Sequence, residues 1–240
     1  MNFPGLGEAA LLLDVDGTLL DFAPTPESVV VPDELIETLG RLRAALGGAL
    51  ALVTGRPVEQ VDALLEGVAH AVAGEHGGAL RRAPGGVIER PELAAMPVGW
   101  LQAAERLAAG HPGVRLERKQ RGFVLHYRQA PTAGAALKAA AAALVAEEGE
   151  RFQLLEAAMA WEVRPAGMDK GVAVEVLMAA APFAGRVPVF IGDDVTDEDG
   201  IRAAHAMGGV GLLVGPVFGG PEGVRRWLRA TAEGRAFPEL

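Results

Sequence analysis

The sequence predicts an α/β fold class, a doubly wound parallel sheet with a smaller α+β domain inserted into it. Three observations lead to this prediction. Apolar runs of strand length alternate with helical apolar patterns in the first part of the chain, and the same alternation returns from Lys170. Between these parts the pattern changes to helix, strand, strand, and it occurs there twice. Alternating strands and helices are typical of a helix-covered parallel sheet, whereas strands joined by short turns are typical of antiparallel sheets.

The first part of the chain is predicted to form strand, helix, strand, helix, strand and a hairpin. Residues 9–15 are apolar apart from Asp14, and such a run is typical of a strand buried on both faces. Residues 32–46 carry apolar side chains at helical spacing and end at Gly47-Gly48, a helix stop. The elements expected next are a strand over 49–53, a helix whose apolar face holds Val58, Val61, Leu64 and Leu65, a strand over 69–73, and a hairpin over 79–90 that turns at Pro84-Gly85-Gly86.

The insertion is predicted as two helix–hairpin units, after which the α/β alternation resumes. Its expected elements are a helix over 96–109, a hairpin over 114–119 and 122–128, an alanine-rich helix over 133–149, and a hairpin over 152–157 and 161–165. The elements expected after it are a helix over 170–180, a strand over 187–191, a helix from Asp197, a strand over 210–214, and a last helix with Val224, Trp227 and Leu228 on its apolar face. We therefore expect a core domain of residues 1–97 and 166–240 and an inserted domain of residues 98–165. Three tryptophans on apolar stripes are expected in the cores: Trp100, Trp161 and Trp227.

Composition excludes several classes of function. Half of the 240 residues are apolar, the formal net charge is −9, and no run of Lys or Arg forms a face for nucleic acid. The absence of cysteine excludes disulfides and thiolate chemistry. The N-terminal residues lack a basic region followed by a long apolar one, and no apolar run approaches the ~18 residues of a membrane span. We therefore expect a soluble, cytoplasmic, monomeric protein that binds neither nucleic acid nor a membrane.

Four polar clusters mark a candidate site. Three follow apolar strands and one begins a helix, where open α/β sheets place their ligand sites. They are Asp14-x-Asp16-Gly17-Thr18, Thr54-Gly55-Arg56, Lys170-Gly171 and Gly192-Asp193-Asp194-x-x-Asp197. Each cluster alone is more often a turn or a helix cap. All four together, in this order on this strand pattern, are hard to explain as turns.

The clusters resemble the four motifs of the haloacid-dehalogenase-type phosphohydrolases, namely DVDGT, a strand-end Thr, a lone Lys and GDDVTD. The resemblance implies the Rossmann-like core of that superfamily, with the insertion as a cap domain. It also implies that the main-chain carbonyl of Asp16 binds Mg²⁺, that Asp194 supports the metal through water, and that Asp197 steadies Lys170. From the residues alone, Asp197 is equally well explained as the N-cap of the following helix.

The residue types of these clusters suit phosphate ester hydrolysis. The Asp14 carboxylate is ionised at neutral pH and can attack phosphorus without a base to activate it. Two like charges about 4 Å apart cost roughly 4 kcal/mol at an effective dielectric near ~20, and Mg²⁺ on Asp14 and Asp193, with the Lys170 ammonium, would offset this. The Thr54 hydroxyl would hydrogen-bond a phosphoryl oxygen. Asp16 would protonate the leaving alkoxide and then take a proton from water.

Five segments together are similar to the trehalose-6-phosphate phosphatases, over most of the chain. They are GEHG (74–77), LERK (116–119), LHYR (125–128), WEVRPAGMDKG (161–171) and GDDVTDED (192–199). The resemblance implies hydrolysis of trehalose 6-phosphate to trehalose and phosphate, with Mg²⁺ as cofactor and a small sugar phosphate as the binding partner.

Substrate contacts are expected from both domains. Beside Thr54, we expect Gly55 and Arg56 to contact the substrate. Glu117 and Lys119 project from one strand face, and with Glu162 they would bind sugar hydroxyls. The alternative for these three is a solvated face with a cross-strand ion pair. The remaining candidates are open between a ligand role and a structural one: His76, His126 and Arg128.

Other functions share parts of this pattern. Sucrose-phosphate and mannosyl-3-phosphoglycerate phosphatases have the same core and cap placement, and phosphomutases have the same nucleophile. A non-catalytic sugar-phosphate-binding regulator belongs to a different class. The presence of Asp14, Asp16, Lys170 and Asp193 argues against it, because a protein that only binds has no use for a nucleophile.

Overall fold

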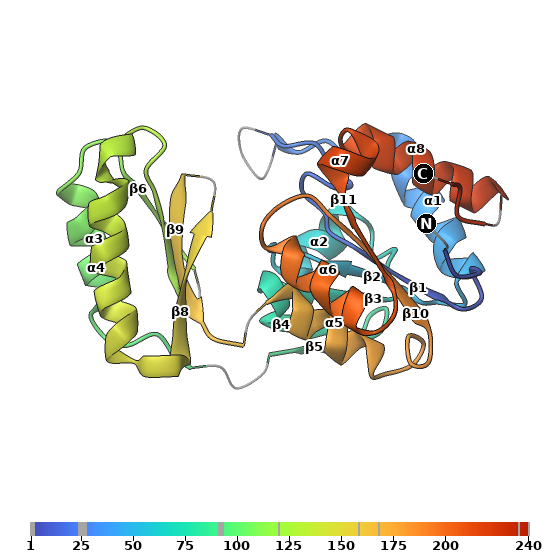
Figure 1. Cartoon of the computed structure of the whole chain (residues 1–240), viewed down its shortest axis with the longest axis horizontal. Helices are drawn as coiled ribbons and strands as arrows, with labels where there is room; N and C mark the ends of the chain where they lie inside the picture. Colours follow the sequence, from blue (N-terminus) through green and yellow to red (C-terminus); the bar gives the residue numbers. More distant parts are fainter. Residues whose placement is uncertain are drawn as a thin grey trace. The chain divides into compact units, whose positions relative to one another are not determined.

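The computed structural model describes residues 3–23, 28–90, 94–119, 121–157, 159–167, 169–234 and 236–239. The chain forms two compact units, Met1–Pro91 with Met168–Leu240, and Glu92–Gly167 (Figure 1). The first boundary falls before the expected 97/98 because Ala94 and Met96 pack against the core of the smaller unit. The second falls after the expected 165/166, where the Ala166 N–H donates to the Arg151 carbonyl at 2.9 Å.

The larger unit is built on a seven-stranded sheet of order β11-β10-β1-β2-β3-β4-β5 among the described residues. Five neighbouring strands are parallel: β1 (Ala9–Leu13), β2 (Leu50–Val53), β3 (Ala71–Gly74), β10 (Val187–Gly192) and β11 (Val210–Leu213). The antiparallel strands β4 (Ala79–Arg81) and β5 (Ile88–Glu89) complete one edge as the predicted hairpin. The predicted fold class is thus confirmed. Every residue of β1 and β2 is buried, as their unbroken apolar sequences require.

Helices cover this sheet. In the described residues the helices of the larger unit are α1 (Asp33–Ala45), α2 (Val58–Leu64), α5 (Lys170–Met178), α6 (Asp197–Ala206), α7 (Val214–Phe218) and α8 (Pro221–Gly234). Helix α5 packs against α6, and α1 packs against α8 (Figure 1). The short α7 was not predicted, because its residues directly follow β11 and continue the same apolar run. Trp227 of α8 is buried in the core, as predicted.

The strand register brings the polar clusters to one edge of the sheet. Leu13 pairs with Ile191 of β10 on one side and with Leu52 of β2 on the other. Because these strands are parallel, the residues that follow each of them leave the sheet at the same edge. Asp14 therefore lies between the loops after β2 and β10.

The smaller unit is a four-stranded antiparallel sheet of order β6-β7-β9-β8 with two helices. Its elements are α3 (Trp100–Ala109), β6 (Arg115–Arg118), β7 (Phe123–His126), α4 (Gly134–Glu147), β8 (Phe152–Ala157) and β9 (Ala160–Pro165). Helix α3 begins at Trp100, later than predicted, because Gly99 has a left-handed φ of 95°. Trp100 and Trp161 are buried in this unit's core, as predicted. In the parts of the chain that the structure describes, no helix combines the length and apolarity needed to cross a membrane.

Candidate active site

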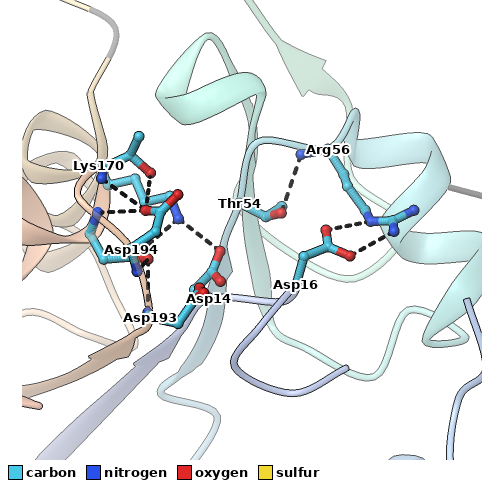
Figure 2. Close-up of polar contacts among 9 residues, drawn as sticks. Asp14, Asp16, Thr54, Arg56, Lys170, Asp193 and Asp194 are labelled. Carbon is cyan, nitrogen blue, oxygen red and sulfur yellow. Dashed lines mark hydrogen bonds and ion pairs between the residues drawn. The ribbon is translucent and has the colours of Figure 1, made fainter. Parts of the chain in front are cut away.

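Asp14 is a buried carboxylate at the carboxyl edge of the sheet. Its N–H donates to the Ile191 carbonyl at 2.9 Å, which continues the β1–β10 pairing by one residue. The residue is only 3% exposed. Burial raises the pKa of Asp14 above its usual value, although the neighbouring Lys170 ammonium opposes this. A carboxylate in this position therefore needs cations close to it (Figure 2).

Lys170 supplies the first of these cations. Its Nζ donates to Asp14 Oδ1 at 2.8 Å and to Asp197 Oδ1 at 2.6 Å, and the side chain is 3% exposed. Burial alone would lower the pKa of this ammonium, but the carboxylates of Asp14 and Asp197 outweigh burial and raise the pKa. Lys170 begins α5 because Asp169 is the N-cap, and the Asp169 carboxylate accepts the Val172 N–H at 2.8 Å. The helix cap thus fixes where the ammonium enters the site.

Asp197 orients Lys170 from the other side. It is fully buried, and while its Oδ1 accepts from Lys170, its Oδ2 accepts the N–H groups of Asp193 at 3.0 Å and Asp194 at 3.2 Å. At Gly192 a Cβ would lie 2.2 Å from Cγ of Asp197, so only glycine fits beside this carboxylate. Both oxygens of Asp197 are engaged in holding the lysine and the loop after β10.

Asp197 is the first residue of α6 and Thr196 is its N-cap, while Asp194 accepts the hydrogen bonds of the preceding turn. Oδ1 of Asp194 accepts the Thr196 N–H at 2.8 Å, the Thr196 hydroxyl at 2.7 Å and the Asp197 N–H at 3.3 Å. The alternative reading of Asp197 as N-cap is therefore wrong, because its oxygens face the residues that precede α6. Support of a metal by Asp194 through water stays a prediction.

Asp193 lies against the loop that carries the first two acids. Oxygens of Asp14, Asp193 and Asp197 all lie within 4.8 Å of one another. Gly17 allows this approach, because it has a φ of 78° and a Cβ there would lie 2.2 Å from Asp193 Oδ2. Burial, together with the charges of Asp14 and Asp194, raises the pKa of Asp193 to about 7. Since the oxygens of Asp197 are already engaged, Asp14 and Asp193 are the pair that fits a divalent cation.

Asp16 and Arg56 form a second ion pair beside Asp14. The guanidinium of Arg56 donates from Nε to Asp16 Oδ2 at 2.6 Å and from Nη2 to Asp16 Oδ1 at 2.7 Å. The Arg56 N–H donates to the Thr54 hydroxyl oxygen at 3.2 Å. Figure 2 shows Asp14 between this pair and the Lys170 cluster. The guanidinium expected to contact substrate thus engages Asp16 in this structure.

His76 packs on the loop after β2. A Cβ on Gly55 would lie 2.6 Å from His76 Nε2, so the imidazole rests directly on this glycine. Glu75 and His76 both have left-handed backbone conformations, with φ of 53° and 55°. Such conformations are uncommon for residues other than glycine. His76 therefore shapes the segment that carries Thr54 and Arg56, and its contact with sugar stays a prediction.

The smaller unit holds a polar cluster on one face of its sheet. Glu117 of β6 lies opposite Val124 of β7, which lies opposite Glu162 of β9, so the two glutamates share a face. The carboxylate of Glu117 contacts Lys119 Nζ at 2.5 Å and His126 Nε2 at 2.8 Å. The hydrogen bond with His126, reinforced by Lys119, lowers the pKa of Glu117 to about 2.

Two features of these clusters were not predicted from the sequence. One is the Asp169 cap, although an Asp three residues before Val172 is a recognisable capping signal. The other is Arg225 of α8, whose Nη1 donates to the Leu19 carbonyl at 2.9 Å and contacts Asp21 at 3.1 Å. No local pattern connects Arg225 with the loop after β1, because the two are distant in the sequence.

Comparison with known proteins identifies relatives that match most of the chain. The trehalose-phosphatase family model matches residues 12–223. The chain is 37% identical to the trehalose-6-phosphate phosphatase of Escherichia coli over 208 residues, 86% of this chain and 77% of that protein. It is 39% identical to the probable trehalose-phosphate phosphatase of Sinorhizobium fredii over 207 residues, 86% and 78% of the two chains. The fold is similar to that of Aspergillus fumigatus trehalose-6-phosphate phosphatase, with a TM-score of 0.66 at 22% identity over 95% and 93% of the chains.

Proposed function

Because the chain belongs to the trehalose-phosphatase family, we propose that it hydrolyses trehalose 6-phosphate to trehalose and phosphate. The observation that carries the mechanism is the buried Lys170 ammonium between Asp14 and Asp197, with Asp193 beside them. This arrangement presents a nucleophilic carboxylate together with the positive charge that a phosphate ester needs.

The first half of the proposed reaction transfers the phosphoryl group to the protein. A carboxylate oxygen of Asp14 attacks phosphorus, and the bond between phosphorus and the sugar oxygen breaks. Asp16, protonated at this stage, gives its proton to that oxygen, so trehalose leaves as a neutral alcohol. Lys170 and Thr54 bind the phosphoryl oxygens while charge moves between them. The product of this half is an acyl phosphate, the mixed anhydride of phosphate with the Asp14 carboxyl group.

The second half returns the protein to its starting state. Asp16, now a carboxylate, takes a proton from a water molecule whose oxygen attacks phosphorus. The bond between phosphorus and the Asp14 oxygen breaks, and inorganic phosphate leaves. Asp16 therefore holds at the end the proton it gave away at the start. The net change is one ester and one water converted to one alcohol and one phosphate.

Magnesium fits the remaining donors of the site. The carboxylates of Asp14 and Asp193, with the main-chain carbonyl of Asp16 as expected from the resemblance, would hold Mg²⁺, which neutralises charge on the phosphate when bound. In its absence, burial of Asp193 and the charges of the neighbouring carboxylates raise the Asp193 pKa. The cytoplasmic location, the monomeric state and the absence of nucleic-acid and membrane partners stay predictions from the sequence.

Metal removal should abolish activity, and Mg²⁺ should restore it. Ca²⁺ should restore it poorly, because calcium accepts more ligands at longer distances.

The pH dependence of the stability of the fold provides a separate check on metal binding. A raised folded-state pKa of Asp193, about 7 against 3.8, destabilises the metal-free fold progressively as the pH rises between these values. Mg²⁺ should therefore raise the melting temperature more at about pH 8 than at about pH 5. Full activity in excess chelator would contradict the metal requirement.

Glu117 and Glu162 should determine which phosphate ester is used. Replacing either with Ala should lower kcat/KM for trehalose 6-phosphate. The activation free energy for kcat/KM should rise by roughly 1–3 kcal/mol, the cost of a lost charged hydrogen bond. Turnover of p-nitrophenyl phosphate should stay unchanged, because it has no sugar hydroxyls. Glu105→Ala is the matched control, since Glu105 pairs with Arg118 at 2.6 Å in the same unit. Equal losses on both substrates would assign the glutamates to the fold instead.

The substrate assignment is tested by phosphate release over a panel of sugar phosphates with Mg²⁺. Trehalose 6-phosphate should give the highest kcat/KM, above sucrose 6-phosphate, mannosyl-3-phosphoglycerate and glucose 6-phosphate. A higher value for one of the others would replace the proposed substrate. Binding of trehalose 6-phosphate without any phosphate release would favour a regulator over an enzyme.

A further inference from the structure

Arg56 has a partner that its expected role does not explain. We propose that Arg56 is a positioning residue: it holds the carboxylate of Asp16 in the orientation required for proton transfer, and it does not bind the substrate. The proposal rests on the proposed function, because that function gives Asp16 the proton transfers.

The geometry of the pair fixes the Asp16 carboxylate in three dimensions. Two parallel hydrogen bonds, at 2.6 and 2.7 Å, join Nε and Nη2 of Arg56 to the two oxygens of Asp16. Such a bidentate pair sets both the position and the plane of the carboxylate. Each oxygen accepts a single bond from Arg56 and retains a lone pair that can take a proton, which the protonated oxygen can later give away. The pair thus restrains Asp16 and leaves it able to react.

Arg56 is more deeply buried than Asp16, as expected for a residue that holds its partner in place. The Arg56 side chain is 9% exposed, whereas that of Asp16 is 29% exposed. The guanidinium is thus nearly buried, whereas the carboxylate that it holds is partly exposed. Asp16 lies in the loop after β1, where its side chain would otherwise sample several rotamers.

Arg56 is itself fixed by its main chain. Its N–H donates to the Thr54 hydroxyl oxygen at 3.2 Å, and its carbonyl accepts the Glu75 N–H at 3.0 Å. A Cβ at Gly74 would lie 2.7 Å from that carbonyl oxygen, so the two loops are in close contact. The three-residue segment Thr54-Gly55-Arg56 therefore carries both the hydroxyl proposed for the phosphoryl group and the guanidinium that places Asp16. This connects the position of the phosphate with the position of the proton donor.

A positioning role of Arg56 can be distinguished from other roles because the two halves of the reaction depend differently on Asp16. The p-nitrophenolate anion leaves without a proton, so phosphoryl transfer from p-nitrophenyl phosphate does not need Asp16 as an acid. Breakdown of the phosphoprotein needs Asp16 as a base with every substrate. An Arg56 variant with a misplaced Asp16 should therefore load phosphate normally and release it slowly.

The experiment measures both rates in single turnovers with enzyme in excess and Mg²⁺ present. Nitrophenolate absorbance gives the loading rate, and acid-precipitable phosphate gives the breakdown rate. In Arg56→Lys and Arg56→Ala the loading rate should stay within about twofold of wild type, and breakdown should slow by roughly 100-fold, as expected for a misplaced catalytic group. For trehalose 6-phosphate, kcat should fall with little change in KM. Lysine should not rescue fully, because it cannot form the bidentate pair.

The chain offers a matched control in a second buried Arg–Asp pair. Nε and Nη2 of Arg81 donate to the two oxygens of Asp62 at 2.8 and 2.9 Å, and neither residue belongs to the four motifs. Arg81→Lys should therefore leave both single-turnover rates unchanged, even where it lowers the melting temperature. The proposal is overturned if Arg56 variants raise KM with kcat retained, if loading and breakdown slow together, or if neither rate changes. Failure of trehalose 6-phosphate turnover in the wild type, with loading and breakdown intact, would refute the substrate instead.

Discussion

Replacing Asp14 with Asn should reduce trehalose 6-phosphate hydrolysis by more than about 10⁴-fold, the scale of loss seen when a covalent nucleophile is removed. The amide oxygen is a poor nucleophile and cannot form the acyl phosphate. The fold should survive, because Asn has nearly the same volume and its carbonyl can still accept the Lys170 bond observed at 2.8 Å. Phosphate release and thermal melting on the same preparation measure both quantities.

Asp62→Asn is the control for the loss of a paired carboxylate. Asp62 accepts two bonds from the buried Arg81, so this change weakens a comparable ion pair whose residues belong to none of the four motifs. Its activity should remain near wild type. Substantial turnover by a folded Asp14→Asn protein would show that another group attacks phosphorus.

Replacing Lys170 with Met should lower kcat by about 10³-fold. Methionine fills most of the volume but leaves the attacking carboxylate and the phosphate without the ammonium between them. A charge–charge interaction at about 4 Å contributes roughly 4 kcal/mol at an effective dielectric near ~20, which corresponds to about three powers of ten in rate. Because Asp14 and Asp197 also lose their shared partner, the melting temperature should fall as well.

Lys138→Met controls for the loss of a lysine charge. Lys138 lies in the smaller unit, where its Nζ is 4.6 Å from the centroid of the Trp161 ring. Phosphate release by this variant should stay near wild type. A Lys170→Met protein that is folded and turns over at a near-normal rate would remove the lysine from the mechanism.

The fold of the larger unit could be predicted from sequence because the residues of each strand show whether that strand is buried in the sheet. Buried parallel strands are apolar throughout, and their carboxyl ends must meet at one edge of the sheet. Asp14, Thr54 and Asp193 each directly follow such a strand. Their proximity therefore follows from the strand pattern alone, before any side chain is placed.

The orientation of side chains in the loops could not be predicted in this way. Arg56 and Asp16 are 40 residues apart, and nothing in the spacing of either motif directs the guanidinium to that carboxylate. For Asp197 the residues alone left helix cap and lysine partner open, and only the resemblance implied the contact with Lys170 that the structure has. These choices depend on which donors each loop leaves unpaired, a property of the folded chain.

The start of α3 and the cluster around Glu117 show a second limit. Residues 96–99 continue an apolar pattern, but a left-handed Gly99 delays the helix to Trp100. His126 is placed beside Glu117 by the register between β6 and β7, and two strands of four residues each give little sequence from which to predict that register.

The most direct test of the mechanism is the location of the phosphoryl group on the protein. Asp16→Asn lacks the base for the second half of the reaction, so a phosphoprotein should accumulate when it is given p-nitrophenyl phosphate with Mg²⁺. Acid quench, proteolysis and mass spectrometry should place the phosphate on the peptide that contains Asp14, and a chelator should prevent its formation. Phosphate on any other residue, or release of nitrophenolate with no phosphoprotein at any time, would contradict the aspartyl-phosphate mechanism.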